Sequence, residues 1–368
     1  MTPRERILTI LKGGRPDRVP WFGDLDYWAS ALIARRKRPL DFKTSADYIR
    51  WHGRLGVGFY LQGHFPFRTI AEYGEKVWPE SNRRFREIET PHGRLRECWE
   101  YLPGSFAEAP VEHLVKSEKD LAALRHIYER TFYEPDYDYA LRRRDQIGDQ
   151  GILVCYLPKS PFMQLVALEA GIEAVALVEA TAPEEFAATL AVMKTAFDRA
   201  ARLAVDSPAE ALMIPENLSA EMVGPRLFET YMRSYQEEWI GKIAAAGKSS
   251  FIHMDGTLKG LLGQEASTGV TVIEALTPAP VGDLAVEAWA EAAGGVETIL
   301  WGGIPGSYFT PAVKDEEFER HVAAVLAVMR SEPRYVLGIA DQVPPDGLES
   351  RVLRVAELVE KYGGYTNP

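Results

Sequence analysis

His253 and Asp255 lie two residues apart in the segment FIHMDGTL, where an apolar run ends and a glycine turn begins. Side chains two residues apart on a strand face the same side, so both groups can reach one point. An imidazole and a carboxylate placed in this way can bind a metal ion, act as an acid–base pair, or form the polar end of a strand. The two residues by themselves leave all three interpretations open.

Other polar residues also follow apolar runs that we interpret as strands. The runs are the eight segments 17–24, 56–64, 151–157, 211–217, 249–255, 269–276, 298–303 and 334–341. Helical patterns separate them, one beginning at a capping box of Thr2 and Glu5 and another at a box that we predict from Thr181 and Glu184. Near-continuous apolar strands that alternate with helices predict an α/β fold, a parallel sheet closed as a (β/α)8 TIM barrel with an N-terminal helix.

Residues 66–150 depart from this alternation. Segments 84–90 and 94–101, joined by a turn at residues 90–93, predict an antiparallel hairpin. We interpret residues 66–150 as a hairpin and helical region that is inserted into a single domain spanning residues 1–368.

The active site of such a barrel lies at the carboxyl ends of its strands. The polar and aromatic residues expected there are Asp24, His64, Tyr156, Glu216, Asn217, His253, Asp255, Trp301, Asp341 and Gln342. Four of them, Glu216, His253, Asp255 and Asp341, come from three strands that can converge on one point. One imidazole with carboxylates suits zinc, iron(II) or manganese, although a single strand-end histidine can also be a hydrogen-bonded structural group.

Composition and charge argue against several classes of protein. A net charge of −11 argues against nucleic acid as a partner. No apolar run approaches the roughly 20 residues of a membrane helix. The two cysteines, Cys98 and Cys155, are too few for a disulfide framework or a cysteine-rich metal site. We therefore expect a cytoplasmic protein that binds neither nucleic acid nor membrane. Residues 302–306 (GGIPG) predict either a tight turn or a phosphate-binding loop.

Several segments, taken in order along the chain, resemble the uroporphyrinogen decarboxylase superfamily, which includes cobalamin-dependent methyltransferases. The segments are TPRERILTILKGGRPDRVPW, LPKSPFMQLVALEAGIEAV, FIHMDGTLKGLL, WGGIPGSYF, YVLGIADQVPPDG and AELVEKYGGY. The resemblance covers essentially the whole chain, and it implies a (β/α)8 barrel. True decarboxylases of the family carry paired arginines after the first segment, where this chain reads FGDLDYWASAL and has none.

The methyltransferase branch, by resemblance, holds zinc with a His-x-Cys pair and a later cysteine. His253 matches its histidine, Asp255 stands in place of the first cysteine, and Asp341 stands in place of the second. Glu216 matches an acidic position that the branch can use near the metal. The resemblance thus implies Glu216, His253 and Asp341 as ligands of a divalent metal, with Asp255 a fourth ligand or a support for His253, and zinc, iron or manganese as the ion.

The resemblance also implies an activity. We expect a metal-dependent methyltransferase that moves a methyl group from a small methyl ether or amine to a corrinoid on a partner protein, with Asp255, Tyr156 and Asp24 in the catalytic pocket. No Asp-x-His-x-x-Gly segment for a corrinoid of its own occurs in the chain. A lyase similar to the decarboxylases and a non-catalytic binding protein are the alternatives, and the protein is expected to be a monomer or a homodimer.

Overall fold

The computed structural model describes residues 1–61 and 64–365, which form two compact units. The barrel unit comprises Met1–His64, Asp138–Tyr156 and Pro208–Pro368. The second unit comprises Phe65–Tyr137 and Leu157–Ser207. It thus contains most of the segment that we expected as an insertion, together with a later stretch of helices, whereas residues 138–150 of that segment belong to the barrel unit.

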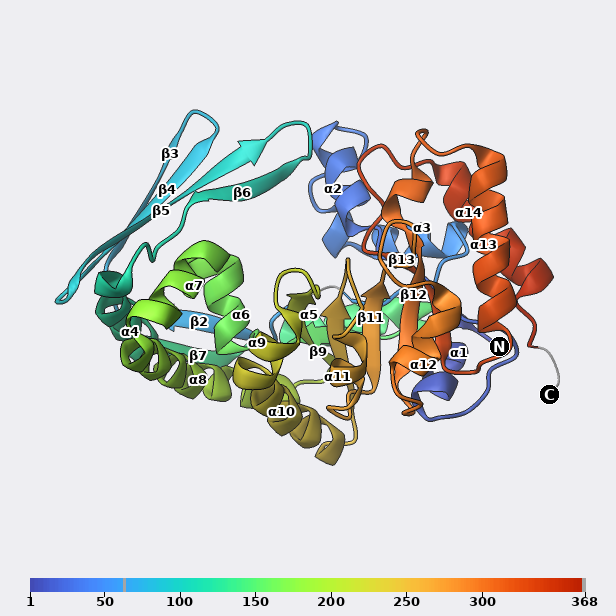
Figure 1. Ribbon diagram of the computed structural model, residues 1–368. Coiled ribbons are helices and arrows are strands. Elements are labelled where there is room, and N and C mark those ends of the chain that lie inside the picture. Colours follow the sequence, from blue (N-terminus) through green and yellow to red (C-terminus); the bar gives the residue numbers. More distant parts are fainter. Residues whose placement is uncertain (62–63, 366–368) are drawn as a thin grey trace. The chain divides into compact units, whose positions relative to one another are not determined.

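The barrel unit is built on a parallel sheet of seven strands in the order β1-β13-β12-β11-β10-β9-β8 (Figure 1). The strands are β1 (Trp21–Phe22), β8 (Val154–Tyr156), β9 (Ala211–Leu218), β10 (Ser249–Met254), β11 (Val272–Leu276), β12 (Ile299–Pro305) and β13 (Tyr335–Ala340). Each falls on one of the runs predicted from the sequence. The prediction of a parallel α/β sheet is therefore confirmed.

The eighth predicted strand, 56–64, is not formed as a strand among the described residues, so a closed eight-stranded barrel is not established. Its described part makes two isolated parallel bridges, one from Gly58 to Phe22 of β1 and one from Phe59 to Gly151 just before β8. Residues 62–63 lie outside the described part. The bridges place this segment between the two edge strands of the sheet.

The bridge at Gly151 depends on the absence of a side chain. A Cβ atom built on Gly151 would lie 1.7 Å from the carbonyl oxygen of Phe59. Gly151→Ala is therefore expected to lower the free energy of unfolding by about 2–4 kcal/mol, because the backbone of the two segments must separate. Gly241→Ala is the matched control: Gly241 lies in a helix with open space around its Cβ position. That change should stabilise the protein by up to about 1 kcal/mol. Urea unfolding measures both effects, and a neutral Gly151→Ala would contradict the contact.

Helices surround the sheet of the barrel unit. They are α1 (Pro3–Leu11), α2 (Asp26–Ala34), α3 (Ala46–Arg54), α5 (Asp138–Ile147), α9 (Gly224–Tyr231), α10 (Arg233–Ala245), α11 (Leu262–Ala266), α12 (Trp289–Ala292), α13 (Asp315–Met329) and α14 (Glu349–Tyr362). The predicted capping box at Thr2 and Glu5 is present in α1. Ile7 and Ile10 of α1 pack in one buried hydrophobic cluster with Phe22, Phe251 and Trp301 of the sheet. The core therefore joins α1 to the strands of the sheet.

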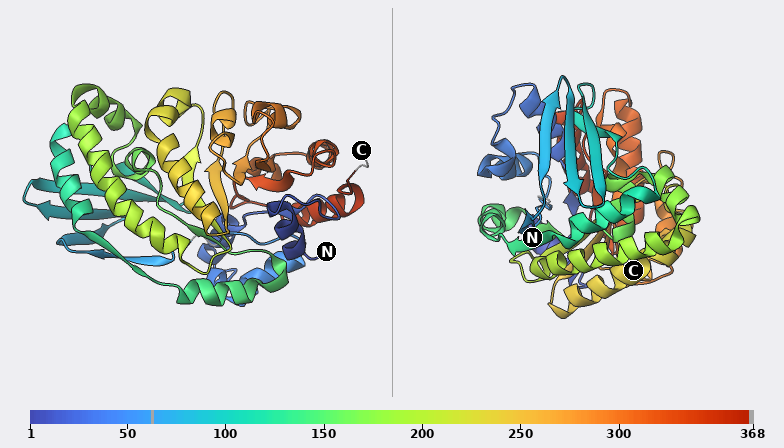
Figure 2. Two further views of the ribbon diagram at one scale, coloured as in Figure 1. Left: turned by 90° about the horizontal axis from the view of Figure 1, so that it is seen from below. Right: turned by 90° about the vertical axis from the view of Figure 1, so that its left-hand side faces the viewer.

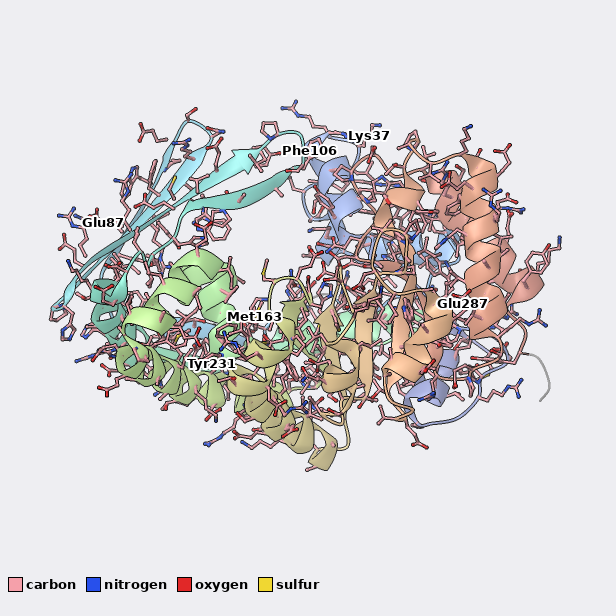
Figure 3. All side chains as sticks on the ribbon, viewed as in Figure 1. Lys37, Glu87, Phe106, Met163, Tyr231 and Glu287 are labelled. Carbon is pink, nitrogen blue, oxygen red and sulfur yellow. The ribbon has the colours of Figure 1, made fainter. Side chains whose placement is uncertain are left out.

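The second unit contains two antiparallel sheets and four α-helices. The strands are β2 (Phe67–Ala71), β3 (Glu75–Glu80), β4 (Arg83–Thr90), β5 (Gly93–Leu102), β6 (Ala107–Glu112) and β7 (Thr131–Pro135). The helices are α4 (Leu121–Glu129), α6 (Pro161–Gln164), α7 (Ile172–Thr181) and α8 (Pro183–Val205), and α8 packs along α4 (Figure 2). The predicted hairpin is confirmed as β4 and β5, which pair from Thr90–Gly93 outward. Figure 3 marks Glu87 on this sheet, which carries many charged side chains.

Two local predictions are wrong. Thr181 is the last residue of α7, and its hydroxyl donates to the Leu177 carbonyl instead of capping α8. Gly302 and Gly303 lie inside β12, so neither a tight turn nor a phosphate-binding loop begins there. Among residues 1–61 and 64–365, no helix is both long enough and apolar enough to cross a bilayer.

Candidate metal centre

Three of the predicted residues converge at the carboxyl edge of the sheet. His253 is near the end of β10, Asp255 follows that strand, and Asp341 follows β13. Nε2 of His253 lies 3.9 Å from Oδ1 of Asp255 and 3.7 Å from Oδ1 of Asp341. One ligand atom from each of the three residues lies within 4.8 Å of the others. We call these residues the His–Asp–Asp cluster.

A buried carboxylate holds the other side of the imidazole. Glu274 of β11, only 1% exposed, lies opposite His253 in the parallel pairing of β10 and β11. Its Oε2 lies 2.7 Å from Nδ1 of His253, and its Oε1 accepts a 2.5 Å hydrogen bond from the Tyr60 hydroxyl. When Nδ1 carries the proton, Nε2 is left facing the two aspartates. Glu274 and Tyr60 therefore fix the orientation of the histidine.

Burial and neighbouring charges shift the pKa values of His253 and Asp341 when no metal ion is bound. Burial by itself lowers the pKa of His253, but the carboxylates of Glu274, Asp341 and Asp255 outweigh it and raise the pKa to about 10. Burial raises the pKa of Asp341 to about 6, although the His253 charge opposes that rise. His253 is 12% exposed, whereas Asp255 and Asp341 are 37% and 39% exposed. The imidazole is thus enclosed, and the two aspartates face open space.

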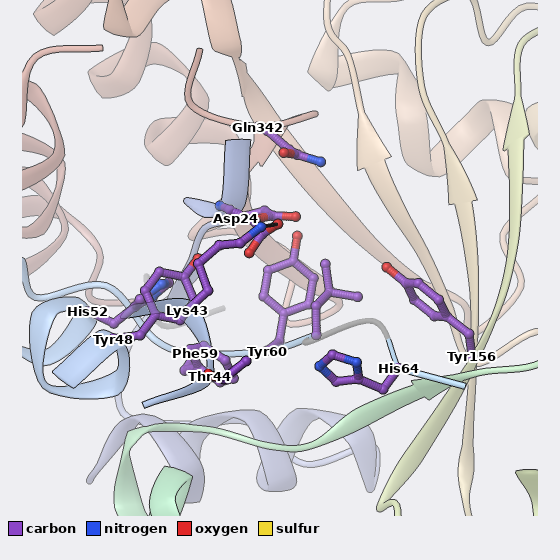
Figure 4. A pocket seen from close by; sticks show the side chains of 12 residues that line it. Asp24, Lys43, Thr44, Tyr48, His52, Phe59, Tyr60, His64, Tyr156 and Gln342 are labelled. Carbon is purple, nitrogen blue, oxygen red and sulfur yellow. Dashed lines mark hydrogen bonds and ion pairs between the residues drawn. The ribbon is translucent and has the colours of Figure 1, made fainter. Parts of the chain in front are cut away.

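A small cavity of about 220 Å³ adjoins the cluster (Figure 4). It is lined by Asp24, Asp26, Lys43, Thr44, Tyr48, His52, Phe59, Tyr60, Leu61, His64, Tyr156 and Gln342. Tyr60 joins the two sites, because it lines the cavity and also binds Glu274. Two predicted pocket residues, Asp24 and Tyr156, are therefore brought to the cavity, together with His64 and Gln342 from the predicted strand ends. Asn217 and Trp301 are not among its lining residues.

Burial raises the pKa values of the two predicted pocket residues. The pKa of Asp24 is raised well above its ordinary value by burial and then by the charges of Asp26 and Asp341. Burial, and then the negative charges of Asp24 and Glu274, raise the pKa of Tyr156. Tyr156 therefore keeps its proton throughout the physiological range and can donate a hydrogen bond into the cavity.

The structure places Glu216 away from the His–Asp–Asp cluster. Glu216 is completely buried, and its Oε1 lies 3.4 Å from the side-chain amide of Gln236 on α10. The same amide, with its nitrogen and oxygen exchanged, donates to both carboxylate oxygens of Glu265 on α11. Glu216 thus faces the helices that cover the sheet. Among the described residues, Glu216 is therefore not part of the cluster, and Asp255 is.

The pair of buried carboxyl groups predicts a pH effect on stability. Burial, followed by the charge of Glu216, raises the pKa of Glu265 well above its ordinary value of 4.5. The folded protein then holds a proton that the unfolded chain releases above about pH 4.5, so this group costs stability as the pH rises. Glu265→Gln should therefore gain about 1–3 kcal/mol over wild type at pH 8, and less at pH 5. Unfolding in urea at the two pH values measures this, and a pH-independent difference would contradict it.

The donor set of the cluster fits a divalent metal. One imidazole nitrogen and two carboxylates can meet at a single point, and the second ring nitrogen already has its carboxylate partner. Histidine ligands are generally oriented in this way in zinc and iron sites. Two oxygen ligands and one nitrogen are less selective for zinc than thiolates are, so iron(II) and manganese suit the set as well.

Sequence reasoning missed the two groups that hold His253. Glu274 stands inside the apolar run TVIEAL, and a charged residue within such a run needs a buried partner. The charge of Glu274 inside this run was therefore a signal in the sequence. The sequence does not identify the partner of Glu274, because that depends on which strand lies beside β11. Tyr60 gave no signal, because it falls in the middle of a predicted strand.

Comparison with known proteins agrees with this architecture. The family described as uroporphyrinogen decarboxylase (URO-D) matches residues 142–362. A methyltransferase from Methanosarcina mazei shares the fold with a TM-score of 0.64, at 13% sequence identity over 98% of this chain and 99% of that one. A putative orotidine 5'-phosphate decarboxylase from Streptomyces avermitilis overlaps far less, with a TM-score of 0.30, 11% identity, and coverage of 67% and 96%. A sequence search of curated proteins finds no match. Since the family match spans more than half of the residues, the chain belongs to the uroporphyrinogen decarboxylase family.

Proposed function

We propose that this protein is a metal-dependent methyltransferase, which moves a methyl group from a small methyl ether or amine to a corrinoid carried by a partner protein. The observation that carries the proposal is the convergence of His253, Asp255 and Asp341 beside a small cavity. The shared fold with the Methanosarcina protein, which is named a methyltransferase, is consistent with it.

The residues of this chain have separate tasks in the proposed reaction. His253, Asp255 and Asp341 hold the metal, and Glu274 and Tyr60 orient His253. A divalent metal bound there would supply a Lewis acid that stabilises negative charge on the heteroatom losing the methyl group. The bond between carbon and heteroatom breaks with its electron pair left on the heteroatom, and the partner's reduced corrinoid supplies the nucleophile. Tyr156 lines the cavity and can donate a hydrogen bond to the leaving heteroatom.

The cavity argues against decarboxylation of a polycarboxylate. Its described wall contains Asp24 and Asp26, and the cation that lines it, Lys43, already lies 2.8 Å from Asp26. A substrate with several carboxylates would therefore meet two aspartates, and no arginine is among the lining residues. This supports a substrate without such groups.

The proposal is tested by mixing the metal-loaded protein with reduced free corrinoid and single methylated donors. Methyl transfer changes the corrinoid absorbance spectrum, so the reaction can be followed directly. We expect at least one small ether or amine to react, and we expect Asp341→Ala to abolish the reaction. Glu265→Gln is the matched control, because Glu265 is a buried carboxyl group outside the cluster. Equal turnover by wild type and Asp341→Ala would contradict the proposal.

A further inference from the structure

The cavity beside the His–Asp–Asp cluster has one carboxylate without a cation. Asp26 pairs with Lys43 at 2.8 Å, and Lys43 also donates to Ser30. Among the described residues, the hydrogen bond to the Asp24 carboxylate comes from the backbone N–H of Asp26, at 2.7 Å, and no ion pair involves it. Asp24 therefore lines the cavity with a carboxyl group that has no cationic partner among the described residues.

Carboxyl groups gather around the cavity. Asp24 and Asp26 line it, and Asp255, Glu274 and Asp341 lie in or beside the adjoining cluster. Of the nearby cations, Lys43 pairs with Asp26, and the Arg143 guanidinium lies 5.3 Å from the centre of the Phe59 ring. A cation bound beside Asp24 would favour the ionised form of its carboxyl group.

Aromatic faces complete the wall. Tyr48, Phe59, Tyr60 and Tyr156 line the cavity, and Figure 4 shows Tyr60 between Asp24 and Tyr156. The Arg143 guanidinium already lies over the rings of Tyr48 and Phe59, so the attraction of a ligand cation depends on Tyr60 and Tyr156. Aromatic faces attract organic cations, and quaternary ammonium groups are bound in this way by aromatic cages. Rings of this kind suit an organic cation, which also gains from contact between its apolar groups and the rings.

We propose that the substrate is a small organic cation whose ammonium group lies against Asp24 and the surrounding aromatic side chains, with its methylated heteroatom at the His–Asp–Asp cluster. This inference rests on the proposed function, and it names the substrate class of the same site. Asp24 is then the residue that determines specificity for charge. The ammonium group serves in recognition, and the cavity volume of about 220 Å³ restricts the substrate to a few heavy atoms beyond that group.

The test compares an organic cation with a neutral ligand of the same shape and with an anion. Calorimetry on the metal-loaded protein measures the binding of choline, of its neutral carbon isostere 3,3-dimethylbutan-1-ol, and of the anion 4-methoxybenzoate. We expect choline to bind about tenfold more tightly than the isostere, and 4-methoxybenzoate to bind most weakly. Equal binding of choline and its isostere, or tightest binding of the anion, would overturn the inference without any variant.

Ligand binding by two variants tests whether Asp24 is the residue that selects for charge. Asp24→Asn should weaken choline binding about tenfold and leave the isostere unchanged, because the change removes charge and keeps the size. Asp145→Asn is the matched control, since the side chain of Asp145 on α5 is 78% exposed and outside the cavity. An Asp24→Asn protein that still prefers choline would overturn the role of Asp24.

The two proposals can fail separately. If charge-selective binding is found but no donor methylates the corrinoid, the substrate class stands and the methyltransferase function fails. If a neutral ether serves as donor and the protein does not prefer cations, the methyltransferase function stands and the substrate class fails.

Discussion

Replacing His253 by alanine is expected to lower the affinity for a divalent metal by about 100-fold or more, because the nitrogen ligand of the cluster is lost. The same change should also destabilise the metal-free protein by about 3–5 kcal/mol, since Glu274 would remain buried without its charged partner. Calorimetric titration with zinc gives the affinity, and urea unfolding gives the stability.

A second variant separates the two effects of His253→Ala. His253→Gln keeps a hydrogen-bond donor near Glu274, so it should lose less stability than the alanine variant while it still binds metal poorly. Circular dichroism shows whether each variant is folded. Metal binding at wild-type affinity by a folded His253→Ala protein would mean that the ion is held elsewhere.

Glu274→Gln is expected to have the second-largest effect. Glu274 accepts hydrogen bonds from both the Tyr60 hydroxyl and Nδ1–H of His253, and a glutamine has one acceptor oxygen for these two donors. The imidazole then loses its fixed orientation and part of its basicity. Loss of such an outer partner costs about 10–100-fold in metal affinity.

Controls distinguish this positioning role from a general effect of removing a buried charge. Glu265→Gln removes a carboxyl group that is equally buried but lies outside the cluster, and it should leave metal affinity unchanged. Tyr60→Phe removes one of the two hydrogen bonds to Glu274, so its effect should fall between the other two. If Glu274→Gln and Glu265→Gln change metal affinity equally, Glu274 does not orient the ligand.

Much of the fold could be predicted, because the strands of a buried parallel sheet are apolar and are bounded by turn residues. The runs that became β9 to β13 are clear examples. Segment 56–64 was less predictable. It makes isolated bridges instead of a regular ladder, and its neighbours need two glycines: Gly151 lets the Phe59 backbone approach, and Gly58 leaves room for the Phe22 ring. Periodicity does not reveal such a contact.

The candidate site was predictable only in part. His253 and Asp341 each stand at the end of an apolar run, and the geometry of a parallel sheet brings such ends together. Glu216 also stands at a strand end, but β9 contains an irregularity. Ile214 pairs with Ile252 and Leu218 with Met254, so four residues of β9 span two of β10. Simple alternation of side chains fails across such a bulge, and Glu216 turns toward the helices.

Metal content measured on protein purified without an affinity tag or chelator tests the central claim most directly. Elemental analysis of the wild type is predicted to find about one equivalent of zinc, iron or manganese, and the His253→Ala protein is predicted to contain almost none. A wild-type protein that takes up no divalent metal under any loading condition would contradict the account.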